Sequence, residues 1–173
     1  MSYDFILTAV IPASPRAIYD AWLDSRGHTA MTGGKAKMSA KLGAPVSAWD
    51  GFIWGENLEL VPGERIVQSW RTTRFTDQDP DSTIAVILTP VDGGTKLTLK
   101  HSNVPDEHTS YEAGGWQSRY FEPMKKYFAK QKPKPKAKTA KRKPAKRKLA
   151  KKTVKKSAKR KPSKRKAARR GKR

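Results

Sequence analysis

The sequence contains no cysteine, only three histidines and no long apolar run. Without cysteine the chain cannot form a disulfide, a thiolate nucleophile or a cysteine-ligated zinc site. No stretch approaches the roughly 18 to 20 apolar residues of a membrane-spanning helix, and the opening MSYDFILTAVIP carries an acid instead of the basic region of a signal peptide. We therefore expect a cytoplasmic protein without a transmembrane segment.

Acidic residues are missing from the end of the chain. Residues 130–173 hold 25 of the 38 Lys and Arg residues and none of the 15 Asp and Glu residues. The net charge of +23 therefore combines a tail of +25 with a preceding segment of −2. Because the tail has few apolar residues to bury and no acids to pair with, we expect a globular domain over 1–129 and a disordered Lys/Arg/Pro/Ala-rich tail over 130–173.

The tail contains a repeat, since AKRKPAKRKLA at 140–150 returns as AKRKPSKRKAA at 158–168. This cation density requires a polyanion, and we expect non-specific nucleic-acid binding through phosphates, with DNA and RNA both open. An anchor on anionic membranes and a nuclear localisation signal are the alternatives. In composition the tail is similar to the lysine-rich arms of linker histones, so we expect nucleoid association in a bacterium or a nuclear location in a eukaryote. The predicted contacts are the basic residues of the two repeats: Lys141, Arg142, Lys143, Lys146, Arg147, Lys148, Lys159, Arg160, Lys161, Lys164, Arg165 and Lys166.

Strand and helix periodicities alternate within 1–129. Ser14 followed by Pro15 predicts a helix start after a first strand. Alternating apolar runs separated by turn signals predict an antiparallel meander. After Asp106, a plausible N-cap, a broad apolar surface predicts a long helix that Pro123 kinks near Arg119. The predicted strands are 5–11, 52–60, 65–72, 83–89 and 95–101.

Three blocks, DGFIWGENLELVPGERIVQSWR, DSTIAVILTPVDGGTKLTLKHSNVP and GGWQSRYFEPMKKYF, resemble the activator of heat-shock protein 90 ATPase homologue family, within the START or Bet v 1-like (SRPBCC) superfamily. The resemblance covers about residues 3–129. It implies an α+β helix-grip fold, in which a curved antiparallel sheet wraps around a long C-terminal helix and two small helices close one end. It also implies a cavity between helix and sheet that holds an apolar small molecule in many relatives.

The same resemblance raises the question of a chaperone partner. The co-chaperone that names the family carries a further N-terminal domain that supplies much of its chaperone contact. This sequence begins directly at its first predicted strand, so we do not expect it to stimulate a chaperone ATPase.

Candidate catalytic chemistry is sparse. The histidines His28, His101 and His108 do not form the i, i+4 pair of a helical zinc site, and TGGKA at 32–36 lacks the spacing of a phosphate loop. We therefore predict no catalytic residues, no metal and no cofactor. A small cavity enzyme of the hydrolase or cyclase type, using His101 and Tyr120, is the alternative.

Aromatic residues are abundant in the predicted domain, and they either line a ligand cavity or form its core. The cavity candidates are Trp54, Trp70, His101, Trp116 and Tyr120. Because no cluster of titratable residues accompanies them, we expect a non-enzymatic binding module that holds an apolar small ligand or a protein partner, with a chaperone as one possibility.

Overall fold

The structure is a computed structural model that describes residues 1–131. The predicted nucleic-acid-binding residues, and all but the first two positions of the predicted tail, lie outside these residues. Within the described part, no helix combines the length and apolarity of a membrane span. The elements are β1 (Ser2–Ile11), α1 (Pro15–Leu23), α2 (Ser25–Thr32), β2 (Pro45–Ala48), β3 (Ile53–Val61), β4 (Arg65–Thr72), β5 (Ser82–Val91), β6 (Gly94–Pro105), η1 (Asp106–His108), η2 (Tyr111–Gly115), η3 (Gln117–Phe121) and α3 (Glu122–Gln131).

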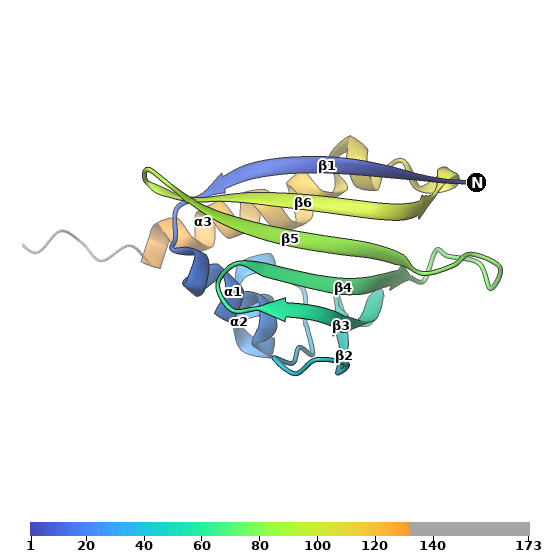
Figure 1. Ribbon diagram of the computed structural model, residues 1–173, viewed down its shortest axis with the longest axis horizontal. Helices are drawn as coiled ribbons and strands as arrows, with labels where there is room; N and C mark the ends of the chain where they lie inside the picture. The colour runs from blue at the N-terminus through green and yellow to red at the C-terminus, as the bar shows by residue number, and fades with distance from the viewer. Residues whose placement is uncertain (132–173) are drawn as a thin grey trace, which may run out of the picture. The chain divides into compact units, whose positions relative to one another are not determined.

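Six antiparallel strands form one sheet in the order β1-β6-β5-β4-β3-β2 (Figure 1). The predicted alternation is confirmed on β6, where Leu97, Leu99 and His101 are fully buried. Their partners on β5 are Leu88, Val86 and Ile84, which point to the same face because paired residues of neighbouring strands share a side. Helices α1, α2 and α3 lie against this inner face, which confirms the expected α+β helix-grip architecture.

Two small helices follow the first strand. Helix α1 begins as predicted, because Ser14 accepts a hydrogen bond from the Ala17 amide at 3.2 Å and Pro15 occupies the first turn. Helix α2 has little periodicity in sequence and was expected only from the family resemblance. Asp24 caps it by accepting from the Gly27 amide at 2.7 Å, so the two short helices meet almost without a connecting loop.

The C-terminal helix is less regular than predicted. The expected N-cap at Asp106 is wrong, because this residue begins the short 3-10 turn η1 and makes no capping bond. The helix breaks at Gly114, whose φ of 149° is non-helical and costs glycine little. The turns of η2 and η3 are π-helical, and η3 continues into α3 through Glu122, which has helical φ and ψ. Pro123 therefore lies inside the helix beside a π-helical turn, and the predicted kink near Arg119 is wrong because the non-helical residue is Gly114.

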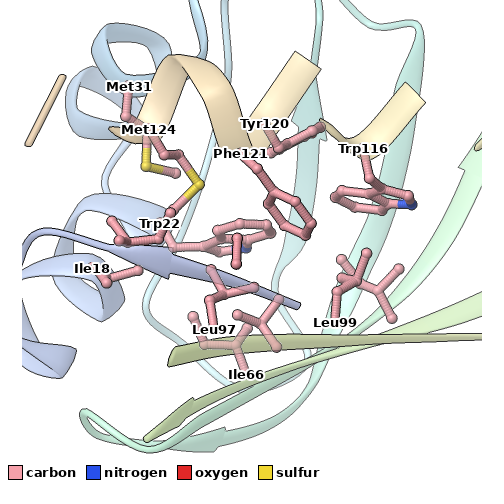
Figure 2. Close-up of a cluster of buried hydrophobic side chains, with 14 of the residues drawn as sticks. Ile18, Trp22, Met31, Ile66, Leu97, Leu99, Trp116, Tyr120, Phe121 and Met124 are labelled. Carbon is pink, nitrogen blue, oxygen red and sulfur yellow. The ribbon is translucent and has the colours of Figure 1, made fainter. Parts of the chain in front are cut away.

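The hydrophobic core lies between the C-terminal helix and the sheet. Figure 2 shows Trp116 and Phe121 of the helix pointing toward Leu97 and Leu99 of β6. On the α3 side, Met124 is fully buried within the same core. On the η2 side the packing is incomplete, and the candidate site lies there.

Candidate ligand cavity

A cavity of about 510 Å³ lies where η2 and η3 pass over the start of β3. One wall comes from the C-terminal helix and the opposite wall from the loop before β3, with Arg74 added from the loop after β4. Its size falls within the range of small-molecule pockets, which usually have apolar walls with a few polar groups. The lining residues are Trp49, Phe52, Ile53, Arg74, Ser110, Tyr111, Gly115, Trp116, Ser118, Arg119 and Tyr120.

Trp49 occupies an unusual backbone conformation at the cavity wall. It has a φ of 53° and is followed by Asp50 at 57° and Gly51 at 87°, so three consecutive residues are left-handed. A bulky residue in this region is strained, which requires surrounding contacts to hold it there. A Cβ on Gly34 would come within 2.7 Å of the Trp49 ring, so glycine is needed for this close approach. The turn therefore places an indole against the cavity at a cost in strain.

His101, a predicted cavity residue, lies fully buried beneath the cavity with both ring nitrogens engaged. Trp116 Nε1 donates to His101 Nδ1 at 3.2 Å, so Nδ1 carries no proton. Ser82 Oγ lies 2.9 Å from His101 Nε2 and donates its own proton to the Trp70 carbonyl at 2.8 Å. His101 Nε2–H must therefore donate to Ser82, which makes His101 a neutral, structural histidine.

Burial lowers the pKa of two histidines, His101 and His28, and so favours their neutral forms. It lowers the pKa of His101 to about 3, although Asp4 acts in the opposite direction. It also lowers the pKa of His28 to about 4, against the hydrogen bond between Nδ1 and the Trp22 carbonyl. Both rings are therefore neutral at pH 7, and neither has the chemistry of a general base poised near neutrality.

Two tyrosines contribute hydroxyls near the cavity. Tyr111 makes a 2.8 Å hydrogen bond with Thr72 Oγ1, and burial raises its pKa against the effects of this bond and of Arg74. The Tyr120 hydroxyl is buried and lacks a hydrogen-bond partner within residues 1–131. Burial also raises the pKa of Tyr120; the Trp49 indole acts in the opposite direction, although the two groups are not in hydrogen-bonding geometry. Tyr120 thus lines the cavity while its neutral hydroxyl is buried behind the wall.

The predicted cavity residues fall in three places. Trp116 and Tyr120 line the cavity. Trp70 and His101 are buried beneath it, where the Trp70 ring lies 4.8 Å from the Trp116 ring and 5.7 Å from the His101 ring. Trp54 points to the outer face of β3 and is 40% exposed. The structure thus brings four of the five together at the cavity, whereas Trp54 lies outside it and borders only a smaller void that Trp70 and Tyr120 also line.

Sequence reasoning missed Trp49, Phe52, Arg74 and Arg119. They come from loops and from the exposed side of the helix, where no apolar periodicity marks a residue as part of a site. A signal was present in the Asp50-Gly51 turn, which places a large aromatic residue, Trp49, two positions before a left-handed glycine.

A second, much smaller void of about 10 Å³ lies beside the cavity. Three of its lining residues, His28, Trp70 and Tyr120, each have a buried polar atom without a protein partner among residues 1–131. A volume of this size suits about one water molecule. Within the same residues, no cluster of three His, Cys, Asp or Glu side chains could hold a metal ion. The cavity is therefore suited to binding a molecule through apolar contacts and hydrogen bonds.

Comparison with known proteins identifies the domain. The sequence is 29% identical over 115 residues to the human activator of 90 kDa heat shock protein ATPase homolog 1, covering 66% of this chain and 34% of that protein. It is 25% identical over 118 residues to the Dictyostelium discoideum homolog, covering 67% of this chain and 30% of that protein. The chain thus spans about a third of the length of these curated relatives.

Solved structures agree on the fold. An Hsp90 activator from Plasmodium falciparum superposes with a TM-score of 0.66 at 24% identity, covering 73% of this chain and 96% of that one. A protein from Chromobacterium violaceum superposes with a TM-score of 0.58 at 26% identity, covering 76% and 99%. The family profile described as "Activator of Hsp90 ATPase homolog 1-like protein" matches residues 12–129. With β3 to β6, η2, η3 and the cavity all inside the matched region, the chain belongs to the Activator of Hsp90 ATPase homolog 1-like protein family.

Proposed function

We propose that the protein is a non-enzymatic binding module whose helix-grip domain holds a small molecule with a largely apolar body, and whose basic tail attaches it to nucleic acid. The observation that carries the first half is the cavity of about 510 Å³, whose walls include the rings of Trp49, Phe52 and Trp116. A wall of this kind favours binding because apolar surface removed from water contributes about 25 cal/mol per Å².

A pair of variants at neighbouring positions tests the cavity. Ser118 lines it from η3, and Ser118→Trp introduces a side chain large enough to obstruct it. Gln117→Trp makes the same kind of change at an exposed position outside the lining. With phenylnaphthylamine as a neutral fluorescent probe, we expect energy transfer from tryptophan to the bound probe in the wild type and in Gln117→Trp. Loss of the signal in both variants, or in neither, would contradict cavity binding.

The second half of the proposal concerns the tail. Its support is the sequence, since residues 132–173 contain 24 basic residues and no acidic ones. If about ten cations contact phosphates, the logarithm of DNA affinity falls against the logarithm of salt concentration with a slope near −9. We expect deletion of 132–173 to abolish this salt-dependent binding, measured by fluorescence anisotropy with duplex DNA and RNA. DNA binding that persists after the deletion would mean that the nucleic-acid site lies in the domain, and it would contradict the proposal that the tail attaches the protein to nucleic acid.

A chaperone partner is the second candidate, because the human relative is named an activator of the 90 kDa heat shock protein ATPase. The test is retention of the chain on immobilised Hsp90, with and without residues 132–173. A specific contact made by the domain should persist after the deletion, whereas attraction between the basic tail and an acidic chaperone should vanish with it. The chaperone's ATPase rate, measured in the same samples, reports whether contact also stimulates it.

The alternative of a small cavity enzyme has less support. Neither nitrogen of His101 is available to a substrate, because Trp116 and Ser82 occupy both. Tyr120 stays protonated at neutral pH, since burial raises its pKa. The domain thus offers hydrogen-bonding and apolar contacts at the cavity but no activated nucleophile or base from the predicted pair.

A further inference from the structure

Two arginines from separate segments of the chain line the cavity. Arg119 extends from η3, and Arg74 extends from the loop that follows β4; both side chains are exposed. Each guanidinium packs on an aromatic ring that also lines the cavity. The central carbon of Arg119 lies 5.4 Å from the Trp49 ring centre, and that of Arg74 lies 5.7 Å from the Phe52 ring centre.

These two charges have no compensating acid. Among residues 1–131, Arg16, Arg65 and Arg71 form salt bridges to carboxylates, whereas Arg74 and Arg119 form none. No Asp or Glu lines the cavity. The cavity therefore combines apolar walls with two positive charges that no lining residue neutralises.

The position of the guanidiniums beside aromatic rings suits them to an anionic ligand. The N–H donors of a guanidinium match a planar or tetrahedral anion, and a neighbouring ring does not use up these donors. The guanidiniums thus stand beside apolar walls that include Trp116.

We infer that the cavity takes an amphipathic anion, a small molecule with an aromatic or alkyl body and one carboxylate, sulfonate or phosphate head held by Arg74 and Arg119. The inference rests on the proposed cavity function and adds the chemical class of the ligand. The head interacts with the two guanidiniums, while the body contacts the rings of Trp49, Phe52 and Trp116.

The test compares two probes with the same ring system. Anilinonaphthalenesulfonate carries an anionic head, and phenylnaphthylamine lacks it. With the full chain we expect the sulfonate to bind about tenfold more tightly. Arg74→Gln and Arg119→Gln should each weaken sulfonate binding about fivefold and leave amine binding within about twofold. Arg119→Lys keeps the charge but loses the planar fork, so it should recover only part of the difference.

Arg26→Gln is the matched control. It removes the same charge from an exposed position on α2 outside the lining, and it should leave the affinities for both probes unchanged. The tail is identical in every variant, so its attraction for the sulfonate cancels in the comparison.

The outcomes separate the two proposals. If Ser118→Trp leaves both probes bound as in the wild type, the cavity is not the binding site and the proposed function fails. If Ser118→Trp removes both probes, but the arginine variants weaken sulfonate binding no more than Arg26→Gln does, the cavity binds ligands and the anion inference is overturned.

Discussion

The two ends of the C-terminal helix meet the same sheet in different ways. At the α3 end, Phe121, Met124 and Phe128 are buried in a continuous core that also includes residues of α1 and α2. At the η2 end, the backbone breaks at Gly114 and the helix passes over a cavity of about 510 Å³. A helix-grip domain can therefore concentrate its buried core at one end of a helix and its binding surface at the other.

The largest expected effect is on the packed end. Phe121 is 2% exposed, and Phe121→Ala should lower the free energy of unfolding by about 3 to 5 kcal/mol, because it removes a buried ring and leaves a void. Trp49→Ala, at the hollow end, should cost less, because Trp49 is only partly buried and its removal loses less buried apolar surface. Urea unfolding followed by circular dichroism measures both.

Equal losses in Phe121→Ala and Trp49→Ala would contradict this division, because the two ends of the helix would then contribute equally to stability. Phe121→Leu serves as the control for the packed end. It keeps most of the buried volume and should cost less than the change to alanine.

Acid should destabilise the protein next most strongly. The folded pKa values of His28 and His101, about 4 and about 3, lie below the unfolded value near 6.5, so the unfolded state binds protons first as the pH falls. Their stabilising contribution is nearly complete at pH 7 and above and declines below it, by about 4 kcal/mol in total between pH 7 and pH 5. Urea unfolding at these pH values measures the slope.

His28→Asn tests the origin of that slope. Asparagine can keep the donor to the Trp22 carbonyl but does not titrate, so the loss of stability between pH 7 and pH 5 should fall by about half. An unchanged slope would show that other groups, carboxylates above all, cause the acid sensitivity.

A smaller effect is expected from the hydrogen bonds beneath the cavity. Ser82→Ala leaves His101 Nε2–H and the Trp70 carbonyl without their partner, which should cost about 1 to 3 kcal/mol in urea unfolding. Ser102→Ala, on β6, deletes a hydroxyl from a partly buried position outside these bonds and is the matched control. If the two variants lost the same stability, the assigned hydrogen-bond chain would have no special importance.

The smallest effect on stability is predicted for Gly34→Ala. The added methyl group would overlap the Trp49 ring and lie 3.2 Å from the Trp49 Cα, so the ring must shift by a few tenths of an ångström or more; because the ring borders the cavity, it has space to do so. We expect a loss below about 1 kcal/mol together with weaker phenylnaphthylamine binding, because the displaced indole enters the binding space. A loss of several kcal/mol with unchanged probe binding would mean that Trp49 is rigidly held.

The sequence was most informative for elements whose apolar residues recur with a regular spacing and are buried in the fold. The alternation at Leu97, Leu99 and His101 predicted the inner face of β6, and Ser14 with Pro15 predicted the start of α1. Helix α2 could not be found this way, since its residues are mostly small and polar and its place depends on the burial of His28 and Met31 against other elements. The prediction of a helix N-cap at Asp106 was wrong because a residue type that favours helix caps also favours a short 3-10 turn.

The candidate site was less predictable than the fold. Trp116 and Tyr120 belong to the helix and share its apolar surface, so pattern alone placed them toward the sheet. Arg74 and Arg119 are exposed, and nothing in their local sequence shows that they meet around one cavity. Trp54 was chosen for its residue type, and strand alternation put it on the outer face. Residues from separate loops become a site only through tertiary structure.

The hydrogen bonds that run from Trp116 through His101 and Ser82 to the Trp70 carbonyl have one further consequence. Apolar side chains tolerate small rotations of a helix against a sheet, because dispersion contacts have little directional preference. The indole donor of Trp116 meets His101 only at one rotational angle of the helix about its own axis. The buried chain therefore sets the angular position of η3 and, with it, the direction in which Arg119 extends.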